Sequence, residues 1–287
     1  MNKTWSTPVR AGNSVLIPCC YCGGFVLKPA LNCGEFVFVR CVSCGLVQMN
    51  PQPVKGEIIA RYNSVFGGDY LDYELENEAD FFKLQQLALR DAGFDNYEKA
   101  LMSDSAGEPP CVLDIGCATG ALLAFLRDRG WRVTGVEISP CADYARKEKS
   151  LDVRKLPLEE NNFLEGSYDT ILASHLIEHL NDPRSFLIEA RRILKNDGRI
   201  FITTPNISGF QARLYGSRWR SAIFDHLYLF SVNTLTRLLE NTGFKVENIS
   251  TWGGLAAGLA PPWLKKPADF LAKRLGLGDV MIVRAKK

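Results

Sequence analysis

Short apolar runs alternate with amphipathic segments over the second half of the chain. The runs are rich in Val, Ile, Leu and Phe, which is typical of buried strands. They occupy residues 111–115, 132–137, 169–174, 199–204, 244–250 and 279–285. Helical patterns lie between them, at residues 120–130, from 139 onward, 182–195 and 231–243. This alternation predicts an α/β fold with a parallel, doubly wound, Rossmann-like sheet.

The rest of the chain is organised differently. Within residues 78–92, Phe81, Leu84, Leu87 and Ala88 recur at helical spacing, and residues 103–110 have the composition of a loop. We therefore expect a zinc-ribbon-like segment at 1–50, a helical connector or lid at 51–108, and a large domain at 109–287 with a C-terminal tail, 251–287.

The first 50 residues hold six of the nine cysteines. Cys19 and Cys22, and again Cys41 and Cys44, form the pattern Cys-x-x-Cys-Gly, with eighteen residues between the two copies. Four thiolates at this spacing suit a closed, structural tetrahedral Zn²⁺ site, and the intervening residues read as a hairpin. Cys20 and Cys33 are left over, and either could replace Cys19 as a ligand.

Composition and charge narrow the class of protein. The 287 residues carry a net charge of +2, so the sequence lacks the strongly basic character that is typical of nucleic-acid-binding proteins. We see neither a secretory signal nor an apolar run of about 20 residues that could span a membrane. We therefore expect a soluble, cytoplasmic protein whose cysteines are mostly reduced, which disfavours a disulfide in place of zinc.

A glycine loop joins the first strand of the large domain to its first helix. Gly116 and Gly120 have the spacing G-x-x-x-G, unlike the dinucleotide pattern G-x-G-x-x-G. Asp114 precedes the loop, where it would repel a pyrophosphate, and Glu137 ends the next strand, where it suits a ribose diol. The pattern favours a ligand with a cationic group and a ribose but no phosphate.

Residues 111–250 resemble the class I S-adenosylmethionine-dependent methyltransferases. The resemblance rests on five segments in the family's order: VLDIGCATG, GVEIS, SYDTILASHLIEHLNDP, EARRILKNDGRIFITTPN and FSVNTLTRLLENTGF. It implies a seven-stranded Rossmann-like sheet and S-adenosylmethionine as the cofactor. The cysteine-rich start also resembles a bacterial subgroup that often acts in surface-polysaccharide or secondary-metabolite pathways.

The resemblance implies roles for particular residues. Gly116, Cys117 and Gly120 would pass beside the methionine part of the cofactor, with Asp114 near its amino group. Glu137 would bind the ribose. The adenine would lie beside Ile138 and Leu158, and Ser174 and His175 would close the pocket. Ala118 stands where the family often has Gly, and we expect binding to survive provided that its φ is negative.

The stretch 174–180 contains His175-x-x-Glu178-His179, an inverted zinc-protease pattern. A zinc protease needs both histidines on a longer helix, whereas Pro183 here leaves room for little more than one turn. We interpret His175 as pocket lining and His179 as a packed or hydrogen-bonded side chain.

The third histidine, His226, lies in a loop, 205–231, that should flank the acceptor. We expect it either to act as the catalytic base or to tie the loop to the core. The same loop carries three arginines and three aromatic residues, which would meet an anionic acceptor or simply be solvated: Arg213, Arg218, Arg220, Tyr215, Trp219 and Phe224. In the tail, Trp263, Leu264, Phe270, Leu271 and Leu275 could contact a membrane surface weakly or pack as an amphipathic helix.

Three functions are compatible with these patterns. The first is methyl transfer from S-adenosylmethionine to a small-molecule acceptor, such as a hydroxyl of a sugar-type or secondary metabolite. The second is an RNA methyltransferase whose ribbon binds nucleic acid, which the near-neutral charge disfavours. The third is a non-catalytic scaffold, which the intact Asp114, Gly116, Gly120 and Glu137 disfavour. The acceptor, the accepting atom and the oligomeric state are left open.

Overall fold

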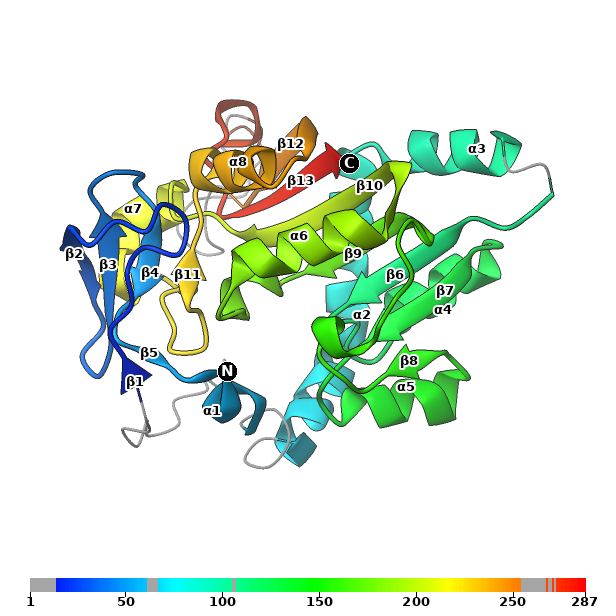
Figure 1. Ribbon diagram of the computed structural model, residues 1–287, viewed down its shortest axis with the longest axis horizontal. Helices are drawn as coiled ribbons and strands as arrows, with labels where there is room; N and C mark the ends of the chain where they lie inside the picture. The colour runs from blue at the N-terminus through cyan, green and yellow to red at the C-terminus, as the bar shows by residue number, and fades with distance from the viewer. Residues whose placement is uncertain (1–13, 61–66, 105–106, 254–266, 268–269, 271) are drawn as a thin grey trace.

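The protein is described by a computed structural model that covers residues 14–60, 67–104, 107–253, 267, 270 and 272–287. Its centre is a seven-stranded sheet of order β12-β13-β10-β9-β6-β7-β8 (Figure 1). The strands are β6 (Cys111–Ile115), β7 (Arg132–Val136), β8 (Val153–Arg154), β9 (Tyr168–Ser174), β10 (Leu194–Pro205), β12 (Lys245–Trp252) and β13 (Val280–Lys286). The Rossmann-like architecture expected from the sequence is therefore confirmed.

One strand departs from the predicted parallel sheet. β13 is antiparallel to both of its neighbours, β10 and β12, so the sheet is mixed. The prediction of an all-parallel sheet was wrong here because apolar periodicity identifies a strand without giving its direction. β8 was missed because only two residues pair with β7.

Helices cover both faces of the sheet (Figure 1). α6 (Pro183–Ile193) and α8 (Val232–Asn241) pack on one face together with Leu113 and Ile171. α2 (Gly67–Asp91), α3 (Phe94–Asp104) and α4 (Ala121–Asp128) pack on the other with Val112 and Leu172. Consecutive strand residues thus enter opposite cores, as the pleat requires. α5 (Cys141–Lys149) packs beside α4 at the β8 edge.

Side-chain caps begin α6 and α8. Asp182 accepts a hydrogen bond from the Ser185 N–H at 2.9 Å, and Ser231 forms a capping box with Thr234. The predicted inner face of the helix at 78–92 was wrong in part, since Leu84 and Leu87 are exposed. Of the predicted positions Ala88 is buried, and it continues into a buried stripe with Leu89 and Ala92 where the helix packs near α3 and α4.

The N-terminal segment forms a small antiparallel sheet of order β11-β4-β3-β2. The predicted hairpin is confirmed as β2 (Leu27–Asn32) and β3 (Val37–Cys41), followed by β4 (Val47–Met49). β11 (Tyr228–Leu229) comes from the loop after β10, so the two parts of the chain share this sheet (Figure 1). β1 (Ser14–Val15) pairs with β5 (Gln52–Pro53), and α1 (Lys55–Ala60) follows.

Within the described ranges, no helix combines the length and apolar character needed to cross a bilayer.

Candidate active site

The glycine loop after β6 has an unusual backbone. Gly116, Ala118 and Gly120 have φ values of 75°, 45° and 76°. The condition of a negative φ at Ala118, on which the expected survival of binding depended, is therefore not met. A left-handed conformation costs a residue with a Cβ about 1 kcal/mol, and the Ala118 N–H donates to Glu137 Oε2 at 3.0 Å, which holds the loop in this shape.

The two glycines are also closely packed against leucine side chains. A Cβ on Gly116 would lie 3.3 Å from Leu176 Cδ1, and one on Gly120 would lie 2.5 Å from Leu151 Cδ1. Larger residues would push the loop away from β9 or from α5. The loop is thus fixed close to the carboxyl end of the sheet, where ligands of this fold class bind.

Glu137 braces the loop from the end of β7. Besides the Ala118 N–H, its carboxylate accepts from the Ser139 N–H at 2.8 Å. Asp114 lies behind it and is only 2% exposed. Burial raises the pKa of Asp114 to about 7, and the negative charge of Glu137 adds to this effect.

α2 brings further carboxylates to the same edge. Burial raises the pKa of Glu74 to about 7, with a contribution from the charge of Glu137, while His175 acts in the opposite direction. Burial alone would raise the pKa of Glu78 too, but hydrogen bonds with Lys149 and Thr119 lower it. The sequence analysis missed both residues, although Glu74 and Glu78 are four apart and hence on one helix face.

The other predicted cofactor residues occupy the ends of neighbouring strands. β6 pairs with both β7 and β9, so Ile138, Ser174 and His175 follow strands that flank the glycine loop. Leu158 is buried in the adjoining core. The Cys117 side chain faces the core as well, because a Cβ on Gly135 would lie 2.7 Å from its Sγ.

His175 and Glu178 are joined after β9. His175 Nδ1 lies 3.2 Å from Glu178 Oε1, and Thr204 Oγ1 donates to Glu178 Oε2 at 2.9 Å. Burial alone would raise the pKa of Glu178, but the hydrogen bond and positive charge of His175 lower it to about 2. The helical turn here, η3, covers only Ile177–His179, which confirms that the motif is not set on a long helix.

His226 packs against His179. Their ring centroids are 4.7 Å apart with the planes at 79°. His226 Nδ1 donates to the Ser221 carbonyl at 2.8 Å, and burial lowers the pKa of His226 to about 3. The structure therefore brings all three histidines to one end of β9, beside the glycine loop.

Sequence comparison identifies the family. Residues 86–249, more than half of the chain, match the profile of the methyltransferase domain family. The chain belongs to this family. A probable S-adenosylmethionine-dependent methyltransferase of Mycolicibacterium smegmatis is 30% identical over 141 residues, which cover 48% of this chain and 52% of that protein. A ubiquinone biosynthesis O-methyltransferase of Pseudomonas aeruginosa is 32% identical over 103 residues, covering 33% and 44%.

The methyltransferase domain also resembles solved structures. A S-adenosylmethionine-dependent methyltransferase of Thermotoga maritima superposes with a TM-score of 0.51 at 22% identity, over 76% of this chain and 99% of that one. The 1,6-didemethyltoxoflavin-N1-methyltransferase of Burkholderia thailandensis, solved with S-adenosylhomocysteine, gives 0.51 at 18% identity over 91% and 99%. At these identities the likeness establishes the fold. The matches span about half the length of the curated relatives.

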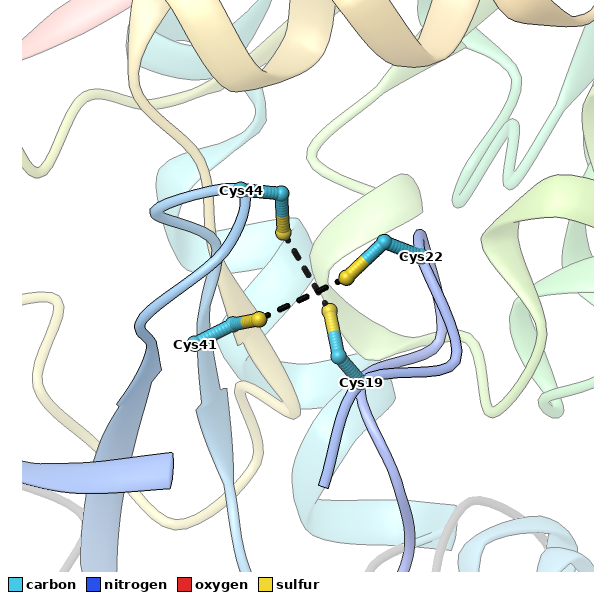
Figure 2. A group of neighbouring side chains, drawn as sticks. All are labelled: Cys19, Cys22, Cys41 and Cys44. Carbon is cyan, nitrogen blue, oxygen red and sulfur yellow. Dashed lines mark hydrogen bonds between the residues drawn. The ribbon is translucent and has the colours of Figure 1, made fainter. Parts of the chain in front are cut away.

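Four cysteine sulfurs converge beside the methyltransferase domain (Figure 2). Cys19 and Cys44 Sγ are 3.4 Å apart, Cys22 and Cys41 Sγ are 3.5 Å apart, and all four lie within 4.8 Å of one another. Sulfurs around a tetrahedral zinc are separated by about 3.8 Å, so the group fits that ion. Cys20 and Cys33 lie outside the group, and burial raises the pKa of Cys20 to about 12.

The basic loop of the methyltransferase domain contains α7 (Phe210–Tyr215) and η4 (Gly216–Arg218). Trp219 and Arg220 both donate to the buried Asp279, which fastens the loop to the start of β13. Arg213 and Arg218 are exposed. In the tail, Phe270 and Leu275 are exposed, whereas Trp263, Leu264 and Leu271 lie outside the described residues.

Proposed function

We propose that this chain transfers a methyl group from S-adenosylmethionine to a small-molecule acceptor. The observation that carries the proposal is the group of three carboxylates around the glycine loop, of which Asp114 and Glu137 are buried and Glu74 is half-buried. Burial and the negative charge of Glu137 raise the pKa of both Glu74 and Asp114, so the edge favours a cationic ligand. S-adenosylmethionine supplies a sulfonium and an ammonium and has no phosphate for these carboxylates to repel.

The cofactor would be held largely by this edge of the sheet. Gly116, Cys117 and Gly120 offer backbone beside the methionine part, and Asp114 lies near its amino group. Glu137 would accept from the ribose hydroxyls through the lone pairs that Ala118 and Ser139 leave. The adenine would rest against Ile138 and Leu158, with Ser174 and His175 closing the site. Glu74 joins this set from α2.

When bound, the cofactor supplies an activated methyl group and its own leaving group, so no acid catalyst is needed. The chain contributes positioning, which brings the accepting atom to about 3–3.5 Å from the methyl carbon. We retain His226 as a proposed base. A ring with a pKa of about 3 is a weak base at neutral pH, so this role requires acceptor binding to raise that pKa.

The acceptor is proposed to be a hydroxyl of a sugar-type or secondary metabolite. Relatives named as O-methyltransferases of ubiquinone biosynthesis support a small hydroxylated acceptor. The exposed Arg213 and Arg218 would suit an anionic substituent on it. We further propose that the Cys19, Cys22, Cys41 and Cys44 thiolates bind a structural zinc ion. It would stabilise the small sheet that β11 shares with the methyltransferase domain.

A methyl-transfer assay tests the proposal. Protein would be incubated with methyl-labelled S-adenosylmethionine and panels of nucleotide sugars and hydroxylated aromatic acids, and labelled product would be counted. We expect transfer to members of one panel, lost in Glu137→Ala and retained in Glu240→Ala, an exposed glutamate on α8. Turnover that is unchanged in His226→Ala would remove the base from the proposal. Transfer to RNA instead would overturn the small-molecule assignment.

A further inference from the structure

A second group of potential metal ligands lies at the carboxyl end of β9. One ligand atom each from Glu178, His179 and His226 lie within 4.8 Å of one another. Nitrogen and oxygen ligands bound at about 2.1 Å to a single cation are separated by roughly 3–4 Å. Side-chain movements of about 1 Å would therefore complete a shared site.

Both histidine rings are oriented as metal ligands usually are. His179 Nδ1 contacts the Asp225 carbonyl at 2.9 Å, and His226 Nδ1 contacts the Ser221 carbonyl at 2.8 Å. Because a carbonyl oxygen can only accept, both Nδ1 atoms carry the proton. An imidazole that carries its proton on Nδ1 coordinates a metal ion through Nε2. Backbone carbonyls that fix the tautomer in this way are a regular partner of metal-binding imidazoles.

The third ligand is a deeply buried carboxylate. Glu178 has no exposed surface, and its oxygens are oriented by His175 and Thr204. Its backbone carbonyl also accepts from the Leu227 N–H at 2.7 Å, which ties η3 to the residue after His226. His175 already offsets part of the desolvation of this carboxylate, and a divalent cation shared with two imidazoles would add a second positive partner.

We propose that Glu178, His179 and His226 bind a divalent first-row metal ion, and that this ion binds the oxygen atom to be methylated. Two imidazoles and one carboxylate suit Zn²⁺, Mn²⁺ or Fe²⁺. Three protein ligands leave positions open for the acceptor. This role rests on the proposed methyl transfer, and it makes His226 a ligand instead of the base.

The position of the site suits that role. His175 connects the proposed metal site to the glycine loop, because this residue follows β9 beside the loop and also contacts Glu178. A metal ion lowers the pKa of a hydroxyl bound to it. The acceptor O–H would lose its proton to water, and the oxygen lone pair would form the bond to the methyl carbon. The C–S bond would break with its electron pair on sulfur.

The zinc-protease pattern in the sequence is thus replaced by a different set of ligands. That pattern would use His175 and His179 from one helix. The structure instead places His175 behind Glu178 and supplies the third ligand from the loop before β11. Sequence spacing could not reveal this group, since 46 residues lie between His179 and His226.

Manganese binding tests the site directly. Mn²⁺ prefers nitrogen and oxygen ligands, so it should not displace zinc from the four cysteine sulfurs. We would titrate zinc-loaded full-length protein with Mn²⁺ and measure free Mn²⁺ by electron paramagnetic resonance. We expect one Mn²⁺ per chain, with affinity at least tenfold weaker in His179→Ala and in His226→Ala. Glu240→Ala, which removes an exposed charge on α8, should bind like the wild type.

Binding of S-adenosylhomocysteine in the same samples separates the two proposals and reports on folding. His226 is buried, so His226→Ala could lose metal binding by misfolding. His179→Ala changes a half-buried ring and therefore tests the metal site with less disturbance of the fold. If folded wild-type protein binds S-adenosylhomocysteine but neither Mn²⁺ nor a second Zn²⁺, the metal site is wrong. It is also wrong if both alanine variants bind Mn²⁺ normally. Mn²⁺ binding without any S-adenosylhomocysteine binding would instead contradict the proposed function.

Discussion

Asp114→Asn should stabilise the cofactor-free protein while weakening cofactor binding. Asp114 is buried, and its pKa rises from 3.8 to about 7 on folding because of desolvation and the charge of Glu137. Below pH 3.8 the carboxyl is protonated in both states and contributes nothing. Between pH 3.8 and 7 the unfolded chain is ionised while the folded one keeps its proton, so stability falls as pH rises.

The size of the effect follows from the same values. At pH 8 the penalty reaches at most about 4 kcal/mol, since each pKa unit corresponds to about 1.4 kcal/mol. Asn lacks the charge but still buries an amide, so we expect a net gain of about 2–3 kcal/mol at pH 8 and almost none at pH 4. Urea unfolding of both proteins at the two pH values measures the difference.

The cofactor should reverse this gain. A cationic ligand compensates the buried negative charge of Asp114 in the wild type, whereas the variant has no charge at this position to compensate. Calorimetry at pH 8 should therefore show S-adenosylmethionine binding at least tenfold weaker to Asp114→Asn. The variant should be more stable than the wild type at pH 8, by a margin larger than at pH 4. If it is not, the assignment of Asp114 as a buried carboxylate that is destabilised by its own charge is refuted.

Three other substitutions probe separate parts of the structure. Ala118→Gly should raise the free energy of unfolding by about 0.5–1 kcal/mol, because it relieves the positive φ, and unchanged or reduced stability in urea would contradict this. Cys41→Ser should lose one zinc per chain by elemental analysis whereas Cys33→Ser keeps it, and equal zinc content would exclude the cysteine site. Thr204→Val removes a hydrogen-bond donor to the buried Glu178 and should lower the free energy of unfolding by about 2 kcal/mol in thermal unfolding. An unchanged free energy of unfolding would contradict this.

The sheet and the glycine loop could be predicted because their signals are local. β6 is an uninterrupted apolar run, and Gly116 and Gly120 are needed by the backbone itself. The caps at Asp182 and Ser231 depend on residues three positions away, so they are also visible in one segment. The four clustered cysteines, Cys19, Cys22, Cys41 and Cys44, follow a spacing that a tight turn dictates.

The remainder depends on contacts between distant segments. Glu74 lies near the glycine loop only because α2 packs against α4. The sequence of α2 alone does not reveal that packing. β11 pairs with β4 across nearly 180 residues, and the antiparallel direction of β13 depends on how the chain returns after β12. The left-handed φ of Ala118 is imposed by the bond to Glu137, nineteen residues away.

The central claim is that the carboxylate-lined edge binds the methyl donor. Calorimetric titration of zinc-loaded protein with S-adenosylhomocysteine, beside Glu137→Ala and Glu240→Ala, tests it most directly. We predict micromolar binding that Glu137→Ala abolishes and Glu240→Ala preserves. Absence of binding to folded, zinc-loaded protein, or equal binding by all three proteins, would contradict the claim.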